Sequence, residues 1–332
     1  MRVLFNTYPV AFDCLGGGEI QLLESKQALE RAGLEVLSYD PWDPQFDDVD
    51  LVHYFSVQGG SMNFCSHVKR RGLPLLISPI LWLTEQNRGE LPLDEIHDLL
   101  HLSDLVLTTS NAETQQLADF FALDTDHFRV AHNAVDESFT QPVSAGLFTD
   151  HFGITEPFLL NVANIESRKN QLRLIQAARQ TSMKLIILGR VRDPSYFDCC
   201  RREAGDSLTY LGHLDHDDLL LKSAYRACQA FVLPSLLETP GLAALEAAVC
   251  GARLVVTEVG CTREYFGPLA HYVDPLDTEN IRLAILRAME SSDSTSLQNH
   301  VLNNFTWGRT AGELIAAYES VLGRNSGREP RE

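Results

Sequence analysis

The sequence predicts an α/β fold made of two consecutive domains, each built around a parallel sheet. The chain has 332 residues, which exceeds the usual length of a single domain. Short apolar runs rich in valine, isoleucine and leucine recur along it, and stretches with helical spacing separate many of them. This alternation is typical of parallel sheets whose strands are buried by helices on both faces.

Six apolar runs in the first half predict buried strands, at residues 2–8, 34–39, 51–55, 74–80, 104–110 and 128–134. Helical periodicity between them predicts helices, notably at 19–32, 93–103 and 111–122. We therefore expect a Rossmann-like first domain over residues 1–140.

The second half repeats this pattern with six further runs, at 158–165, 184–189, 208–212, 230–235, 253–258 and 271–274. A polar stretch with Pro142 and Gly146 precedes them and predicts a linker at 135–146. We expect a second Rossmann-like domain at 147–305. The charged, proline-containing ending predicts a disordered tail at 324–332.

Composition argues against several functional classes. A net charge of -18 repels phosphate backbones, which excludes a nucleic-acid partner. No apolar run approaches eighteen residues, and the N-terminus begins with a strand pattern, so we expect a cytoplasmic protein whose membrane contact, if any, is peripheral. The seven cysteines form no CxxC pair and predict reduced thiols.

Three glycines stand immediately before the first predicted helix, at Gly16, Gly17 and Gly18. Glycines there let a ligand approach the backbone, and free N–H groups at a helix start attract anions. A dinucleotide fingerprint would require a further glycine at position 21, where the chain has Gln21, which argues against a nicotinamide oxidoreductase. A tight turn without a ligand is the alternative.

A second anion-binding candidate follows the first strand of the second half, in "NIESRKNQ". Arg168 and Lys169 lie beside a helix start expected at Asn170, where both cations and the helix amides could hold a diphosphate. The alternative is a solvated loop with two exposed cations.

The stretch "ETPGLAALE" carries two glutamates around a predicted helix start. Thr239 suits the N-cap and Pro240 the first helical position. Glu238 would then lie just outside the helix and Glu246 about 10 Å along its axis, too far for the two carboxylates to share a proton. This spacing fits a ligand whose sugar lies near Glu238 and whose ribose lies near Glu246. Because its neighbours are apolar, Glu246 is poorly placed for an idle surface residue.

Aspartate-rich pieces at 40–50, 124–126 and 215–218 raise the question of a metal site. Each falls in a connection, where aspartate commonly caps helices and makes turns, so we predict no metal site. The alternative is a metal bound around "HLDHDD", where His213 and His216 lie close to aspartates.

With these residues in place, the chain resembles the retaining nucleotide-sugar glycosyltransferases of glycosyltransferase family 4. The specific part is the pattern "PS..E..G...LEA..CG" within 231–256, supported by "GGGE", by "RKNQLRLIQAA" at 168–178 and by 305–322. The resemblance implies the GT-B fold, in which two Rossmann-like domains face a central cleft. It also implies transfer with retention of anomeric configuration, no metal or other cofactor, and a helix at 306–322 that packs back on the first domain.

The resemblance also implies roles for individual residues. Lys169 would contact the diphosphate, Glu246 the ribose hydroxyls and the loop at His213 and Leu214 the base. Glu238, with the amides near Gly241 and Leu242, would contact the donor sugar and phosphate, which makes Glu238 and Lys169 the catalytic candidates. Gly17 and Gly18 would approach the donor phosphates from the first domain.

The chain departs from the family pattern at two positions. Many relatives have an arginine five or six residues before the diphosphate lysine, where this chain has Asn164, and Arg168 is the candidate substitute. Many also have a histidine where this chain has Ser78, which leaves His53 and Ser78 as candidates for the acceptor or sugar side.

The leading hypothesis is an enzyme that moves a hexose from a UDP- or GDP-sugar to a glycan, lipid-linked or small-molecule acceptor. A catalytically silent nucleotide- or glycan-binding subunit of the same fold is the alternative, and a NAD-dependent oxidoreductase is less favoured.

Overall fold

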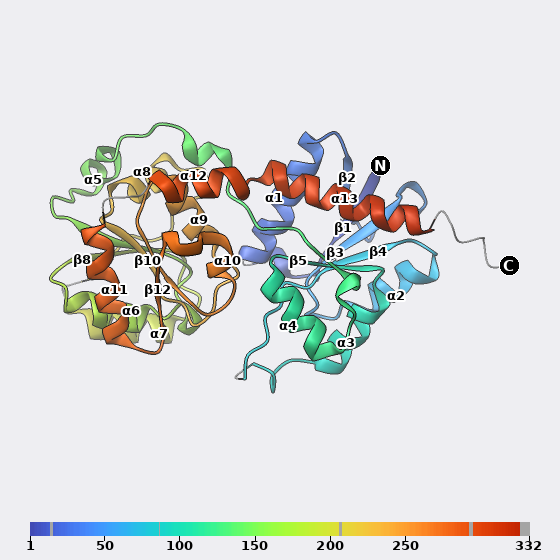
Figure 1. The fold of residues 1–332 in the computed structure, drawn as a ribbon, viewed down its shortest axis with the longest axis horizontal. Helices are drawn as coiled ribbons and strands as arrows, with labels where there is room; N and C mark the ends of the chain where they lie inside the picture. Colours follow the sequence, from blue (N-terminus) through green and yellow to red (C-terminus); the bar gives the residue numbers. More distant parts are fainter. Residues whose placement is uncertain (14–15, 86, 206–207, 292–294, 326–332) are drawn as a thin grey trace. The chain divides into compact units, whose positions relative to one another are not determined.

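The chain forms two compact units. A computed structural model describes residues 1–13, 16–85, 87–205, 208–291 and 295–325. The first unit contains Met1–Asn133 and the C-terminal segment from Trp307, and the second contains Ala134–Thr306 (Figure 1). The stretch 135–146, predicted as a linker, therefore belongs to the second unit. The predicted tail at 324–332 lies outside the described residues from residue 326 onwards.

Within the described part of the first unit, six parallel strands form one sheet in the order β2-β1-β3-β4-β5-β6. All six predicted runs form strands, each within its predicted range: β1 (Arg2–Asn6), β2 (Glu35–Ser38), β3 (Leu51–Phe55), β4 (Leu75–Ser78), β5 (Leu105–Thr108) and β6 (Phe128–Val130). The helices are α1 (Gly17–Arg31), α2 (Met62–Arg70), α3 (Leu93–Leu102), α4 (Asn111–Phe121) and α13 (Trp307–Asn325).

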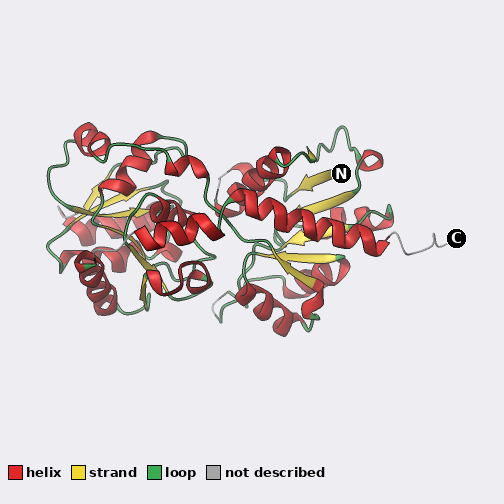
Figure 2. Cartoon of the chain, turned by 45° about the horizontal axis from the view of Figure 1, so that its top comes forward, coloured by secondary structure: helices red, strands yellow, loops and turns green. Residues whose placement is uncertain are grey.

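The second unit has the same layered design, with helices around a parallel sheet (Figure 2). Its described strands run in the order β12-β11-β10-β7-β8-β9. They are β7 (Phe158–Val162), β8 (Lys184–Leu188), β9 (Leu208–Tyr210), β10 (Ala230–Leu233), β11 (Leu254–Thr257) and β12 (His271–Val273). The helices are α5 (Gly146–Phe152), α6 (Gln171–Arg179), α7 (Pro194–Ala204), α8 (Leu219–Ala227), α9 (Leu242–Val249), α10 (Thr262–Phe266), α11 (Thr278–Glu290) and α12 (Thr295–Asn304).

Aspartates in the predicted turns act as caps, as the sequence indicated. Asp218 accepts a hydrogen bond from the Leu220 amide at 2.8 Å and begins α8. Asp124 accepts one from the Asp126 amide at 2.9 Å. Each bond satisfies an N–H group that has no partner inside its own helix.

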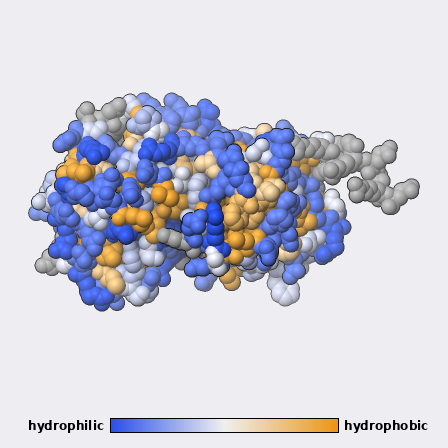
Figure 3. Space-filling model, turned by 60° about the horizontal axis from the view of Figure 1, so that its bottom comes forward, coloured by the Kyte–Doolittle hydropathy of each residue, from blue (hydrophilic) through white to orange (hydrophobic). Residues whose placement is uncertain are grey.

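In each unit, strand residues and residues from the surrounding helices and loops together form the core. Hydrophilic residues cover much of the face shown in Figure 3. No helix among the described residues has both the length and the apolar character needed to cross a membrane. Each cysteine whose surroundings are described is a free thiol, and Cys14 lies outside the described residues.

The C-terminal helix α13 is part of the first unit, where it packs against α1. Its Tyr318 hydroxyl lies 2.8 Å from His53 Nδ1, while His53 Nε2 lies 2.8 Å from Ser78 Oγ. All three side chains are buried. His53 and Ser78, considered for the acceptor or sugar side, are thus core residues that bond to each other and to α13. A strand histidine with both ring nitrogens occupied has no group left for a ligand.

The buried His53 predicts a loss of stability in acid. Burial lowers its pKa to about 3, whereas an unfolded histidine titrates near 6.5. As the pH falls from about 6.5 towards 3, the unfolded chain binds a proton that the folded chain does not, so stability decreases. Between pH 7 and 5, we expect this residue to contribute about 2 kcal/mol to the fall in unfolding free energy. Urea unfolding at both pH values should show a smaller fall in His53→Gln.

The control is His97→Gln, which changes a half-exposed histidine on α3. It should keep the pH dependence of the wild type. An identical pH dependence in His53→Gln and the wild type would contradict the assignment of a neutral core histidine.

Candidate functional site

The candidate site lies where the strand order of the second sheet changes direction. The chain runs from β7 outwards to β8 and β9, then returns to β10 on the other side of β7 and continues to β11 and β12. Loops that follow two adjacent strands at such a point leave in opposite directions, and ligands of open α/β sheets bind there. The two loops here are 163–170 after β7 and 234–241 after β10, which contain the motifs singled out in the sequence.

Hydrogen bonds hold these loops to each other and to the loop after β12. The Leu236 amide donates to the Arg168 carbonyl at 2.9 Å. The buried Asn170 side chain donates to the carbonyls of Pro234 at 2.8 Å and Pro275 at 2.7 Å. Asn170 has a left-handed backbone with φ of 59°, which asparagine tolerates better than most residues. These hydrogen bonds link the loop backbones directly.

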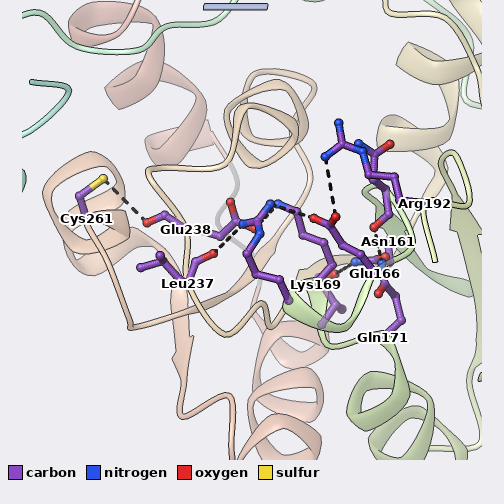
Figure 4. A network of polar contacts seen from close by, with 11 residues as sticks. Asn161, Glu166, Lys169, Gln171, Arg192, Leu237, Glu238 and Cys261 are labelled. Carbon is purple, nitrogen blue, oxygen red and sulfur yellow. Dashed lines mark hydrogen bonds and ion pairs between the residues drawn. The ribbon is translucent and has the colours of Figure 1, made fainter. Parts of the chain in front are cut away.

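Lys169 and Glu238 form an ion pair across the two loops (Figure 4). Lys169 Nζ lies 2.6 Å from Glu238 Oε1, and the two side chains are only 14% and 4% exposed. Burial alone would raise the pKa of Glu238, but the charges of Lys169 and Arg168 outweigh it and hold that pKa below its ordinary value. Burial lowers the pKa of Lys169, and the charge of Glu238 opposes this shift. In each case burial is opposed by the charge of a partner in the neighbouring loop.

The loop after β11 fixes the backbone of Glu238. The Glu238 amide donates to the Val259 carbonyl at 3.2 Å, and the Cys261 amide donates to the Glu238 carbonyl at 3.1 Å. Gly260 lies between these contacts with φ of 106°, and a Cβ there would lie 2.0 Å from the Glu238 carbonyl oxygen. Only glycine permits this approach.

The helix that follows begins later than the sequence predicted. We expected Thr239 as N-cap and Pro240 as the first helical residue, but α9 begins at Leu242 with Gly241 as its N-cap. The bridge between Glu238 and Gly260 keeps the chain extended, and Gly241 then enters the helix with φ of 89°. A Cβ on Gly241 would lie 3.0 Å from Glu238 Oε2. The carboxylate therefore lies beside the helix start, where unpaired N–H groups carry partial positive charge.

Arg168 lies next to this pair and is more exposed. Its guanidinium contacts Glu166 Oε1 at 3.0 Å, while Arg192, from the loop after β8, lies 3.7 Å from Glu166 Oε2. Glu166 and Arg192 are not among the residues predicted from the sequence, although Glu166 stands in the motif "NIESRKNQ". The ion pair with Glu166 gives Arg168 a carboxylate partner other than Glu238. Asn164, the departure from the family pattern, contributes its carbonyl to a hydrogen bond from Gln171 at 2.9 Å.

The second glutamate is buried, as expected from its apolar neighbours, and is 7% exposed. Glu246 Oε2 accepts a hydrogen bond from the Tyr225 hydroxyl at 2.7 Å, and Oε1 lies 3.3 Å from His216 Nδ1. Tyr225 is not among the residues predicted from the sequence, and His216 is predicted there only as an alternative metal ligand. A lone tyrosine in an amphipathic helix carries no signal of such a partner, since packing brings α8 and α9 together.

The predicted base-side residues lie in the loop after β9. His213 is exposed and lies 3.4 Å from Asp215 through Nε2. Burial and the nearby Arg190 charge lower the pKa of His213, against the opposing charge of Asp215. The Gly189 amide donates to the Gly212 carbonyl at 2.7 Å, which joins the loops after β8 and β9. Leu214 is partly buried in the same loop.

The remaining candidates belong to the first unit. Gly17 and Gly18 form the first turn of α1, and a Cβ on Gly18 would lie 3.1 Å from the Ile80 side chain. Their assignment to the donor phosphates stays a prediction. Over the described ranges, no group of three or more histidine, cysteine, aspartate or glutamate side chains is arranged to hold a metal ion.

The residues of the candidate site lie within a stretch of the chain that matches a known family. Residues 150–304 match the family described as "Glycosyl transferases group 1". The chain is 26% identical over 239 residues to the serotype-specific mannosyltransferase WbdA of Escherichia coli, a match that covers 66% of this chain and 29% of WbdA. It is 25% identical over 250 residues to the D-inositol 3-phosphate glycosyltransferase of Stackebrandtia nassauensis, covering 68% and 56%. The chain thus spans less than two thirds of these relatives.

Solved structures share the fold over nearly the whole chain. Sucrose-phosphate synthase from Thermosynechococcus elongatus has a TM-score of 0.80 at 20% identity, covering 97% of this chain and 99% of that one. HepE of Anabaena, in complex with UDP, has a TM-score of 0.78 at 17% identity, covering 96% and 100%. Together with the two parallel sheets, these similarities establish the GT-B fold expected from the sequence.

The buried ion pair predicts strong coupling between Lys169 and Glu238. Glu238→Gln leaves a buried ammonium without its carboxylate and should lower the unfolding free energy by about 3 kcal/mol. The double variant Lys169→Met, Glu238→Gln should lose much less unfolding free energy than the sum of the losses in the two single variants. Urea unfolding of the wild type, the two single variants and the double variant measures this coupling energy. The coupling should be present above the ordinary glutamate pKa and disappear as the pH falls through the lowered pKa of Glu238.

The exposed pair of Lys26 and Glu30, 3.8 Å apart on α1, provides the control. Lys26→Met and Glu30→Gln should show little coupling because solvent screens surface pairs. Additive losses for Lys169 and Glu238 would mean that the ion pair does not hold the two loops.

Proposed function

We propose that this protein transfers a sugar from a nucleotide diphosphate donor to an acceptor. The match of residues 150–304 to the family described as "Glycosyl transferases group 1" supports this proposal. The observation that carries the proposal is the position of the Lys169–Glu238 pair beside the start of α9, with Glu246 farther along the same helix, at the switch point of the second sheet. A cation, helix amides and a second carboxylate along one helix suit the diphosphate and the ribose of such a donor.

Lys169 is the main ligand of the diphosphate in this proposal, with Arg168 beside it. An ammonium has three N–H donors, and Glu238 takes one of them, so two remain for phosphate oxygens. The amides near Gly241 and Leu242 face the same charge from the helix start. Glu238 thereby fixes the position of the cation and stands closest to the donor sugar, while Glu246 binds the ribose hydroxyls. His213 and Leu214 line the base.

These groups also supply what the chemical step requires. As the bond between sugar and diphosphate breaks, negative charge develops on the leaving phosphate, and the preorganised Lys169 and helix amides stabilise it. This arrangement replaces a divalent ion, so we propose metal-independent transfer. We further propose retention of anomeric configuration, with the acceptor attacking from the face that the diphosphate leaves and a phosphate oxygen accepting its proton.

The proposed donor is a UDP- or GDP-sugar. The HepE structures with UDP and with UDP-glucose support the first of these, and WbdA, described as a mannosyltransferase, supports a hexose as the transferred sugar. The proposed acceptor is a glycan, a lipid-linked or a small molecule, and the proposed location is the cytoplasm. The catalytically silent subunit is the second candidate, because Asn164 replaces an arginine of the family pattern. Turnover of donor by the purified protein excludes it.

We expect nucleotide binding to depend on Lys169 and Glu246. UDP, GDP or ADP, or their sugars, should raise the melting temperature of the wild type, because a ligand that binds only the folded state stabilises it. Lys169→Ala should weaken binding of the effective nucleotide at least tenfold, through the loss of charge-assisted bonds. Glu246→Gln should cost about 1–3 kcal/mol of binding free energy, for the free nucleotide and the sugar nucleotide alike. Calorimetric titration measures both effects.

The matched control is Glu258→Gln, an exposed glutamate that pairs with Arg263 at 2.9 Å in the same unit. It should bind nucleotide as the wild type does. Absence of any thermal shift with all the nucleotides would overturn the proposed function, and wild-type affinity in both site variants would place the nucleotide elsewhere.

Donor turnover should persist in excess EDTA, because the cation and the helix amides carry the charge of the leaving diphosphate. The measurement is release of nucleoside diphosphate from the donor found in the thermal screen, with and without chelator. Activity that disappears in EDTA and returns with manganese would contradict metal-independent transfer.

A further inference from the structure

Glu246 is held from two sides by residues that the family motif does not include. Its Oε2 atom accepts a hydrogen bond from Tyr225 on α8, and its Oε1 atom lies 3.3 Å from Nδ1 of His216, in the loop before α8. Tyr225 is completely buried, whereas the His216 side chain is 38% exposed. The carboxylate thus has one oxygen fixed from the protein interior and the other beside a residue that solvent reaches.

The partners of Glu246 differ in kind from those of Glu238. Glu238 has a cation that compensates its charge, while the hydroxyl of Tyr225 orients the Glu246 carboxylate without contributing a positive charge. A carboxylate held in this way keeps its capacity to accept further hydrogen bonds. Hydroxyl groups of a neutral sugar are donors of the kind that it can still accept.

The aromatic ring of Phe139 packs near both partners of Glu246, His216 and Tyr225. Its ring lies 4.9 Å from the ring of His216 in an edge-on arrangement and 6.2 Å from the ring of Tyr225. Lys222 Nζ lies 5.1 Å from the centre of the Phe139 ring and donates to the carbonyl and hydroxyl oxygens of Ser138, both at 3.0 Å. The segment expected as a linker therefore packs against both partners of Glu246, which limits the orientations of His216 and Tyr225.

We propose that Tyr225 and His216 are positioning residues for recognition of the ribose 2′-hydroxyl by Glu246. Tyr225 sets the plane of the carboxylate through Oε2, and His216 restricts the Oε1 side, where the ribose hydroxyls bind. The preferred ligand is consequently a ribonucleotide and not its 2′-deoxy counterpart. The inference rests on the proposed function, since it assigns Glu246 to the ribose of the donor.

The test compares UDP, GDP and ADP with their 2′-deoxy counterparts by calorimetric titration. The wild type should bind the better ribonucleotide at least tenfold more tightly than its 2′-deoxy form, because a site built for a hydroxyl rejects an analogue without it. In Tyr225→Phe we expect the ribonucleotide affinity to fall about fivefold and the deoxy affinity by less than twofold, so that the ratio between them narrows. His216 is more exposed than Tyr225, and His216→Gln should also narrow the ratio of ribonucleotide to 2′-deoxynucleotide affinity.

The matched control is Tyr272→Phe, which removes a tyrosine hydroxyl bonded to the Gly267 carbonyl at 2.6 Å on the far edge of the same sheet. It should leave the ratio unchanged, whatever it does to the melting temperature. The inference would be overturned if every Tyr225 or His216 variant that folds kept the wild-type ratio of ribonucleotide to 2′-deoxynucleotide affinity. It would also be overturned if the wild type bound the ribonucleotide and its 2′-deoxy form equally. A wild type that binds no nucleotide would instead overturn the proposed function.

Discussion

The buried ion pair between Lys169 and Glu238 is the interaction on which the rest of the candidate site depends. Removing two charges from water is costly, and such a pair persists only where geometry and further polar contacts compensate for the lost hydration. Here the two charged groups come from loops that leave adjacent strands at the switch point of the sheet. The pair therefore holds together the two segments that a ligand at this point would contact.

Close backbone contacts make that pair geometrically achievable. Gly260 lets the loop after β11 approach the carbonyl of Glu238, and Gly241 lets the chain turn into α9 beside the carboxylate. Asn170 ties the loop that carries Lys169 to the loops after β10 and β12. Each of these positions brings polar groups together at distances that a different side chain would prevent. The charged groups thus meet at fixed positions instead of on mobile loops.

The two glutamates of "ETPGLAALE" have different electrostatic surroundings, although only eight positions separate them in the chain. Glu238 has its charge compensated by Lys169, whereas Glu246 is oriented by the Tyr225 hydroxyl and has His216 beside it. The first arrangement immobilises a cation next to the helix amides. The second leaves an oriented carboxylate able to accept hydrogen bonds. Strand β10, the loop after it and helix α9 therefore carry two chemically distinct carboxylates, one just before the helix and one inside it.

The sequence by itself determined the twelve strands found among the described residues, the division into two α/β units and the identity of Lys169, Glu238 and Glu246 as site candidates. Apolar runs bounded by turn residues and charged residues inside apolar surroundings are local signals, so they can be read without the fold. The late start of α9 was decided by tertiary structure, because contacts with Gly260 keep Glu238 extended. Burial of His53 and Ser78 against Tyr318, 240 or more residues further along the chain, likewise required the packing of α13. The partners of Glu246 also come from elements whose proximity no local pattern encodes, since a hydrogen bond between distant residues exists only once both helices have packed.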